Sequence, residues 1–310
     1  ATSENSIQES IAQIYIQILY AAESVRVNEN TLQVSIAQRD RGQELLNAGS
    51  IAKSDFAQLE AQVSTDRYQL VTAQATLQDY KLQLKQLLEL DGENEMNIYL
   101  PALSDENVLS PLPAKRDVYV SALALRPEIE ASKLNVNASE LGIDIAKSGY
   151  LPTVSLSAGI GTNHTSGSDF TFSEQVKNGW NNSIGLSVSV PIFNNRQTKS
   201  AVQKAKLQYE TSMLSLLDEQ KALYKTIEGL WLDANSAQQR YAAANEKLKS
   251  TQISYNLISE QFNLGMKNTV ELLTEKNNLL QAQQEQLQAK YMAILNTQLL
   301  KFYQGDKLAL

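Results

Sequence analysis

The feature that most constrains the fold of this chain is the length of its uninterrupted helical patterns. Residues 197–264 contain no proline and a single glycine, Gly229. Apolar residues recur three or four positions apart through residues 6–48 and again through 54–90, which places them along one face of a helix. At ~1.5 Å of rise per residue, each of these two shorter arms is about 55–65 Å long. Pairs of such helices are typical of coiled coils and helical barrels, so we predict a mainly α fold.

Two turns of the chain repeat one another. The stretch "LLNAGSIAKSDF" aligns without a gap with "QFNLGMKNTVEL", so that Gly49 matches Gly265 and Asp55 matches Glu271. Each acid stands in the first turn of the helix that follows its glycine, and we expect Ser54 to be the N-cap of the earlier one. The alignment predicts two copies of a long antiparallel helix hairpin, about 216 residues apart.

Between the helical stretches, residues 148–161 and 183–193 alternate in a different way. One parity is apolar, and the other is mostly serine, threonine and glycine. Such alternation over about ten residues is typical of a strand in a transmembrane β-barrel. A soluble hairpin packed on a helical bundle would have the same period, so periodicity alone leaves both open. In a barrel, the residues expected to face lipid are Val154, Leu156, Ile160, Leu186, Val188 and Val190.

Composition narrows the classes of function. The net charge is −7 and no basic run is present, so the chain lacks the electrostatic footprint of a nucleic-acid binder. It has no cysteine, and no stretch approaches the ~18 consecutive apolar residues of a membrane-spanning helix. The single histidine, His164, falls in the loop between the predicted strands. With no metal-ligand, dinucleotide or phosphate-loop motif, we predict that the protein is not an enzyme and holds no cofactor or metal.

The patterns divide the chain into six segments. We expect a first-repeat helical hairpin in 1–90, an irregular connector with three of the six prolines in 91–115, and one helix of the second repeat in 116–149. A β-ribbon follows in 150–194, then the second-repeat hairpin in 195–303 and a short tail in 304–310.

Four motifs in this order resemble the TolC family of outer-membrane efflux proteins. They are "LRPEIEAS", "YLPTVSLSAG", "SVSVPIFNN" and the repeated glycine followed six residues later by an acid. The resemblance implies a homotrimer in the outer membrane of a Gram-negative bacterium, with a β-barrel in outer-membrane lipid and a helical barrel in the periplasm. It also implies the exit duct of an efflux pump or type I secretion system, with a periplasmic adaptor and an inner-membrane transporter as partners.

Two other functions compete with that of a channel. A periplasmic adaptor also owns a long helical hairpin, but we expect an adaptor to carry one hairpin flanked by small β domains. A structural coiled-coil spacer without a pore would leave the ribbon unexplained. One departure from the family matters: the family has a strand pair in each repeat, whereas only the second repeat has one here. We expect the chain to begin inside its first repeat.

The resemblance also implies roles for the residues of the two turns. Gly49, Ser50, Gly265 and Met266 correspond to the periplasmic tip that contacts an adaptor. Asp55, Glu271, Lys267 and Phe262 correspond to the gate of the periplasmic aperture. We expect Lys267 to reach an acid such as Asp55, whereas Phe262 stands where a tyrosine is common, which puts a hydroxyl latch in doubt. The competing role for Asp55 and Glu271 is that of a first-turn acid stabilised by the helix dipole.

Overall fold

A computed structural model describes residues 2–90, 98–99 and 108–308 of the chain. The chain divides into two compact units, which are described separately. Unit 1 comprises Ala1–Pro127 and Gln220–Leu310, and unit 2 comprises Glu128–Glu219. None of the helices in the described ranges is both long and apolar enough to cross a membrane.

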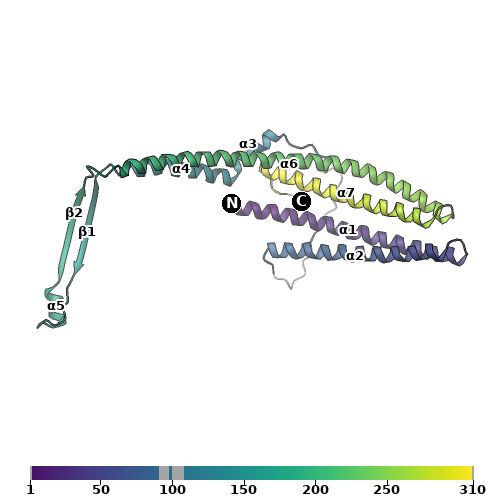
Figure 1. Cartoon of the computed structure of the whole chain (residues 1–310), viewed down its shortest axis with the longest axis horizontal. Helices are drawn as coiled ribbons and strands as arrows, with labels where there is room; N and C mark the ends of the chain where they lie inside the picture. Colours follow the sequence, from purple (N-terminus) through teal and green to yellow (C-terminus); the bar gives the residue numbers. More distant parts are fainter. Residues whose placement is uncertain (1, 91–97, 100–107, 309–310) are drawn as a thin grey trace. The chain divides into compact units, whose positions relative to one another are not determined.

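Unit 1 is built from two helix hairpins. The helices α1 (Thr2–Asn47) and α2 (Lys53–Leu87) form the first hairpin. The second consists of the later part of α6 (Gln197–Asn263) and α7 (Thr269–Gln304). The hairpins lie side by side with both turns at the same end (Figure 1). The sequence-predicted pair of hairpins is therefore confirmed, with helix ends shifted by a few residues from the expected ones.

The core of unit 1 is most apolar away from the turns. There α1 and α7 bury a large cluster in which Ile16 and Leu19 meet Tyr291, Ile294 and Leu295. Each of these side chains is less than a tenth exposed. Burial of one side chain of this size stabilises the fold by about 1.5–3 kcal/mol. This cluster is therefore the main apolar contact between the two hairpins.

The predicted single helix over 116–149 is wrong, because the structure has two helices there. The first is α3 (Lys115–Leu125) and the second is α4 (Pro127–Ser148). Arg126 between them is extended, with φ −75° and ψ 124°, since a residue that precedes proline is pushed away from the helical region. Most of the connector predicted for 91–115 lies outside the described residues.

Unit 2 holds α4, the earlier part of α6 and the β-ribbon. The strands β1 (Thr153–Gly161) and β2 (Asn181–Ser189) pair antiparallel. The loop between them contains a short helix, α5 (Phe172–Asn178). Within unit 2, α4 and α6 approach through small residues, and the hydroxyl oxygens of Ser139 and Ser212 are 2.7 Å apart.

Candidate functional site

The two turns at the end of unit 1 have the same geometry. Gly49 has φ +75° and Gly265 has φ +73°, the left-handed conformation that glycine adopts without steric cost. The next residue in each turn donates its amide hydrogen five positions back: Ser50 to Leu45 O at 2.8 Å, and Met266 to Gln261 O at 2.8 Å. This is the Schellman arrangement that ends many helices, and it confirms the repeat at atomic detail.

The helices that leave the turns also begin alike, and the expectation that Ser54 caps the first of them is wrong. The N-cap is Ala52, and a carboxylate oxygen of Asp55 accepts the Ala52 amide hydrogen at 3.3 Å. In the second repeat, Asn268 is the N-cap and Glu271 accepts its amide hydrogen at 3.2 Å. Both acids therefore satisfy a free donor of a helix start. Asn268 adds a bond that alanine cannot make, because its side-chain oxygen accepts the Glu271 amide hydrogen at 2.9 Å.

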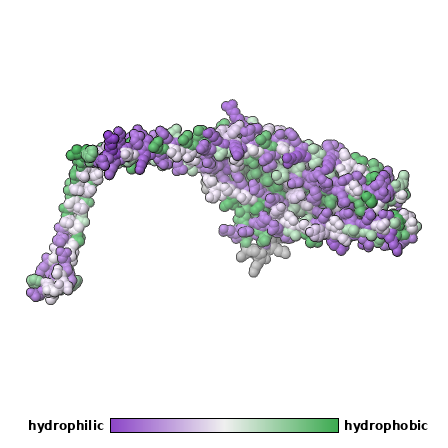
Figure 2. Space-filling model, in the orientation of Figure 1, coloured by the Kyte–Doolittle hydropathy of each residue, from purple (hydrophilic) through white to green (hydrophobic). Residues whose placement is uncertain are grey.

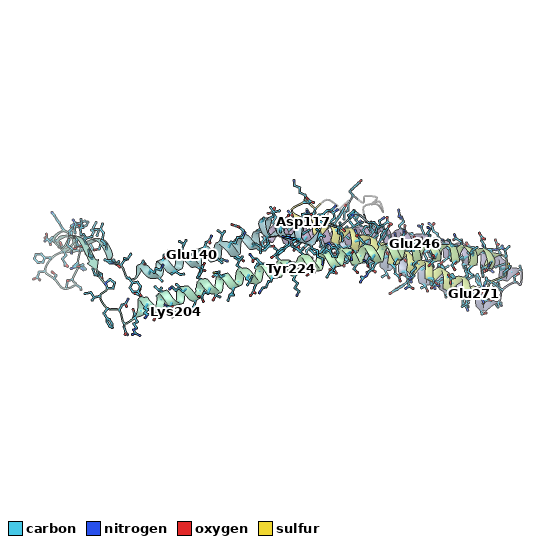
Figure 3. The ribbon with its side chains drawn as sticks, turned by 90° about the horizontal axis from the view of Figure 1, so that it is seen from above. Asp117, Glu140, Lys204, Tyr224, Glu246 and Glu271 are labelled. Atoms are coloured by element: carbon cyan, nitrogen blue, oxygen red, sulfur yellow. The ribbon has the colours of Figure 1, made fainter. Side chains whose placement is uncertain are left out.

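The ion pair of the second turn differs from the predicted one. The ammonium group of Lys267 binds the carboxylate of Glu271 and not that of Asp55. The donation from Lys267, followed by that from the Asn268 backbone, holds the pKa of Glu271 below its ordinary value. Both side chains remain more than a third exposed to solvent. Glu271 lies on α7 at the turn end of unit 1, whereas Glu246 lies on α6 at a distance from that end (Figure 3).

Phe262 lies in the interior of unit 1 instead of on its surface. Its side chain is 2% exposed and packs with Leu59 and Leu272. These three residues come from α6, α2 and α7, so the cluster joins the hairpins next to the turns. Phe262 is therefore a packing residue of the turn end, and its phenyl ring offers no hydrogen bond to a latch.

The outer surface of the turns is partly apolar. Leu264 and Met266 are 74% and 70% exposed, and Val270 is 56% exposed. Gly49, Ser50 and Gly265 are also exposed. The two turns are tied to each other by Arg41, whose guanidinium donates to the Asn263 carbonyl at 3.4 Å. The predicted tip residues are thus brought together on one exposed end.

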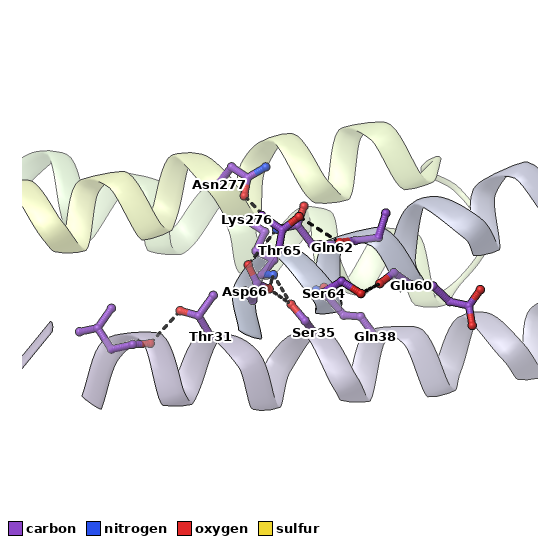
Figure 4. A network of polar contacts seen from close by, with 12 residues as sticks. Thr31, Ser35, Gln38, Glu60, Gln62, Ser64, Thr65, Asp66, Lys276 and Asn277 are labelled. Carbon is purple, nitrogen blue, oxygen red and sulfur yellow. Dashed lines mark hydrogen bonds and ion pairs between the residues drawn. The ribbon is translucent and has the colours of Figure 1, made fainter. Parts of the chain in front are cut away.

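A buried ion pair near the turns was missed in the sequence. Lys276 of α7 and Asp66 of α2 are 3% and 1% exposed, and Lys276 also donates to the hydroxyl of Ser35 on α1 (Figure 4). Burial lowers the pKa of Lys276, while the bond and the charge of Asp66 act to raise it. The signal was present, since Lys276 stands on the buried face of its helix, four residues after Leu272 and three before Leu279.

The ribbon is a second candidate site, because its register gives it two chemically different faces. Val154 pairs with Val188 and Leu156 with Leu186. On the other face, small and polar residues pair with one another: Thr153 with Ser189, Ser155 with Ser187, Ser157 with Gly185, Gly159 with Ser183 and Gly161 with Asn181. White and green residues line the strands in Figure 2.

The apolar face of the ribbon has two exceptions to the predicted pattern. Ile160 pairs with Asn182 near the loop, so the apolar face ends in a polar residue there. Val190 lies just past β2, which ends at Ser189, and it is therefore not a strand residue. Of the predicted lipid-facing set, the other five belong to the strands and are 60–75% exposed. Exposed apolar side chains in this number favour contact with lipid or another chain.

The described part of the chain offers no evident metal centre. Within residues 2–90, 98–99 and 108–308, no group of three or more histidine, aspartate or glutamate residues could hold a metal ion. His164 lies in the loop of the ribbon, where its Nδ1 is 3.1 Å from Gln175 Oε1 and its ring meets Phe172 edge-on.

The family is decided by comparison with known sequences. The profile described as outer membrane efflux protein matches residues 118–305. The chain belongs to this family. It is 24% identical over 294 residues to the outer membrane efflux protein BepC of Brucella suis, covering 94% of this chain and 61% of BepC. It is 24% identical over 309 residues to the outer membrane protein TolC of Escherichia coli, covering 95% of this chain and 60% of TolC. The chain thus spans about three-fifths of these relatives' length.

Solved structures of similar fold agree with the family. CusC aligns with a TM-score of 0.82 at 18% identity, covering 99% of this chain and 70% of CusC. The outer-membrane channel OprN aligns with a TM-score of 0.79, also at 18% identity, covering 98% of this chain and 66% of OprN. The predicted fold class, long helix hairpins in two repeats with one two-stranded ribbon, is confirmed.

Proposed function

We propose that this chain is part of an outer-membrane channel, the passive exit duct of a tripartite efflux pump or type I secretion system in a Gram-negative bacterium. Membership of the outer membrane efflux protein family supports this function. The names of its relatives include both processes, since BepC is an efflux protein and AprF of Pseudomonas aeruginosa is an alkaline protease secretion protein. Such a channel performs no chemical step, so no catalytic residue is assigned.

The observation that carries the proposal is the register of the ribbon. Pairs of apolar residues on one face and of serine, threonine and glycine on the other suit a strand between lipid and a polar lumen. Two strands leave open edges that lipid cannot satisfy, so the ribbon must be completed by other strands. Three chains with two strands each supply six strands, fewer than the about eight of the smallest such barrels. A homotrimer in contact with outer-membrane lipid meets that need once each subunit also contributes the first-repeat strand pair that the family has. Segment 150–194 is then the membrane part, and segments 1–90 and 195–303 form the periplasmic part.

The turn end is the proposed periplasmic aperture. The exposed turn residues Gly49, Ser50, Gly265 and Met266 suit a contact with a periplasmic adaptor, which in turn would bind an inner-membrane transporter. In a trimer, Asp55 and Glu271 would recur around one axis, where rings of carboxylates select for cations. The Lys267 ammonium would offset part of that charge, and Phe262 would hold the helices of the aperture together.

The test is to delete the gene and to restore it on a plasmid in the native bacterium. We expect the protein in the outer-membrane fraction, released only by detergent, and we expect the deletion to raise sensitivity to exported compounds or to abolish secretion of a protein. Release by osmotic shock, or sedimentation with the inner membrane, would instead favour an adaptor or a structural spacer. A variant with Leu156→Asp and Leu186→Asp should fail to reach the outer membrane.

A further inference from the structure

The interface between the two hairpins of unit 1 changes character along its length. Its apolar half, defined by Ala12–Ala21 of α1 and Leu287–Leu300 of α7, holds the large cluster around Ile16 and Tyr291. Its polar half, nearer the turns, is defined by 28–42 of α1, 59–66 of α2 and 269–282 of α7. There the buried residues include Asn28, Thr31, Ser35, Asp66, Thr269 and Lys276.

Outside one network, the polar half has few side-chain hydrogen bonds between the hairpins, among them that from Gln38 Nε2 to the Tyr255 hydroxyl at 2.8 Å. Asn28 and Thr31 donate to their own helix, to Ser24 O at 2.7 Å and Val27 O at 2.8 Å. Within the described residues, Gln38 Oε1 and Thr269 Oγ1 are buried without a hydrogen-bond partner. The apolar side chains of the polar half are the small cluster of Leu59, Phe262 and Leu272 and the buried residues Val63, Leu279 and Ala282.

The network joins three helices at one point. Lys276 of α7 donates to Asp66 of α2 and to Ser35 of α1, and Ser35 donates to Asp66 as well. The second carboxylate oxygen of Asp66 accepts from Gln62 Nε2 at 2.9 Å. Gln62 also reaches Asn277 Oδ1 on α7, at 3.4 Å. The side chains of Ser35, Asp66 and Lys276 are all buried, so the two charged groups contact each other instead of water (Figure 4).

A buried ion pair of this kind adds little to the stability of the native packing. Its main effect is to raise the free energy of other helix packings in which its two partners are separated. Two charges withdrawn from water gain little net free energy when paired, but either of them left buried without its partner costs several kcal/mol. A shift of α7 by one turn against the first hairpin would separate Lys276 from Asp66 and Ser35 together. Next to the pair, small side chains such as Thr31, Ser35 and Ala282 oppose that shift little by packing, so the ion pair adds to the resistance that the Leu59–Leu272 contact gives nearer the turns.

The position of the pair makes this effect matter at the turns. Lys276 stands about 16 Å along α7 from Leu287 of the apolar cluster and about 10 Å from Thr269, where the helix begins. We propose that Lys276 and Asp66 are positioning residues that set the register of α7 on the first hairpin, and so fix where Glu271 and Lys267 stand relative to Asp55. The consequence of this positioning for transport rests on the proposed function, but the positioning itself does not.

The chain has no cysteine, so spin labels can be placed at chosen sites. Ser50→Cys with Met266→Cys reports the distance between the two exposed turns. Ile7→Cys with Met292→Cys, both exposed and outside the polar half, is the reference pair. Distances are measured by pulsed electron resonance on the complete protein in detergent, with labelled subunits diluted by unlabelled ones.

The deciding variant replaces the ion pair by an apolar one, Asp66→Leu with Lys276→Met. We expect its unfolding temperature to equal or exceed that of the wild type, while the turn-to-turn distances broaden and the reference distances stay narrow. The exchanged pair Asp66→Lys with Lys276→Asp should restore a narrow distribution. Arg126→Met removes another buried cation, which pairs with Glu9 at 3.3 Å, and should lower stability without broadening the turn distances.

A narrow turn distribution in the apolar variant would overturn the proposal. If that variant does not accumulate, Asp66→Asn with Lys276→Gln takes its place, because neutral amides penalise a wrong register less than charges do. A narrow distribution there would have the same meaning. Transport is measured in parallel: if the wild type exports nothing, the proposed function fails, whereas broadened distances would still support the positioning role.

Discussion

Lys267 pairs with Glu271, four residues further along the chain, across the N-cap of α7. A lysine next to a helix start opposes the helix dipole, and the carboxylate of Glu271 compensates it while also accepting the Asn268 amide hydrogen. Glu271 is therefore both a capping residue and half of an exposed ion pair. Its counterpart Asp55 shares only the capping role, since its repeat has Ile51 where the second has Lys267.

The pairing predicts opposite changes in ion selectivity of the assembled channel. Lys267→Ala leaves the carboxylate of Glu271 uncompensated and should raise cation selectivity and block by polyvalent cations. Glu271→Gln should lower both. Single-channel recording of the complete protein in planar bilayers measures these quantities. Glu246→Gln, an exposed acid on α6 away from the turns, is the control. Equal selectivity in all three variants would remove Glu271 from the pore.

The lowered pKa of Glu271 predicts a pH-dependent contribution to stability. A carboxyl whose pKa is lower in the folded protein stabilises the fold above its ordinary pKa of 4.5 and loses that contribution as pH falls through the folded value. We expect Glu271→Gln to lower the unfolding temperature at pH 7 and to lower it much less well below pH 4.5. Unfolding scans of both proteins in detergent test this. A difference that does not change with pH would contradict it.

The turn glycines predict a pair of equal destabilisations. At Gly49 and Gly265 an added Cβ meets nothing within 4 Å, so the cost of alanine is that of the left-handed backbone alone, about 1–2 kcal/mol. Gly229, inside α6, also has open space, but alanine there should stabilise the helix by about 0.8–1 kcal/mol. Denaturant unfolding of the three variants measures the sign and size of each change.

The close approach of α1 and α2 near the turns predicts that the effect of Gly42→Ala on stability depends on the residue at position 59. A Cβ on Gly42 would lie 2.3 Å from Cδ1 of Leu59, which is 1% exposed. Gly42→Ala should therefore cost about 1–3 kcal/mol through overpacking. In a Leu59→Ala background the same change should be neutral or stabilising, since helix propensity then dominates. A double-mutant cycle measures the coupling, and additive effects would contradict the steric argument.

Much of the fold was predictable because long elements carry strong periodic signals. The hairpins followed from the spacing of apolar residues, and the repeated turns followed from Gly49 and Gly265, where only glycine fits the backbone without strain. The ribbon followed from alternation along the strands. The break at Arg126 was missed although the sequence carries a local signal for it. Pro127 disfavours a helical conformation at Arg126 and suits the first position of a new helix.

The side-chain partners were less predictable, since they depend on contacts between distant segments. The choice of Lys267 between Glu271 and Asp55 is set by the position of the hairpins, which sequence spacing does not fix. The burial of Phe262 depends on Leu59, some two hundred residues earlier. In the sequence, Lys276 and Asp66 were detectable only as charged residues on apolar helix faces. That position predicts burial for each of them, but it does not indicate which residue each one pairs with.

The register of the ribbon predicts that its two faces respond differently to charge. Leu156 pairs with Leu186 on the apolar face, whereas Ser157 pairs with Gly185 on the other. If the apolar face contacts lipid, Leu156→Arg should cost roughly 2–4 kcal/mol of barrel stability.

Ser157→Arg is the matched control, since it places the same side chain one residue away on the same strand. Its extra charge would lie in a hydrated lumen, where desolvation is small, so we expect it to change conductance and to leave stability nearly intact. Gly185 opposite leaves space for the longer side chain, because it has no Cβ. Reversible folding of the complete protein into lipid bilayers measures stability, and bilayer recording measures conductance. Equal destabilisation by the two arginines would show that neither face is lumenal, and a larger effect of Ser157→Arg would reverse the assignment of the faces.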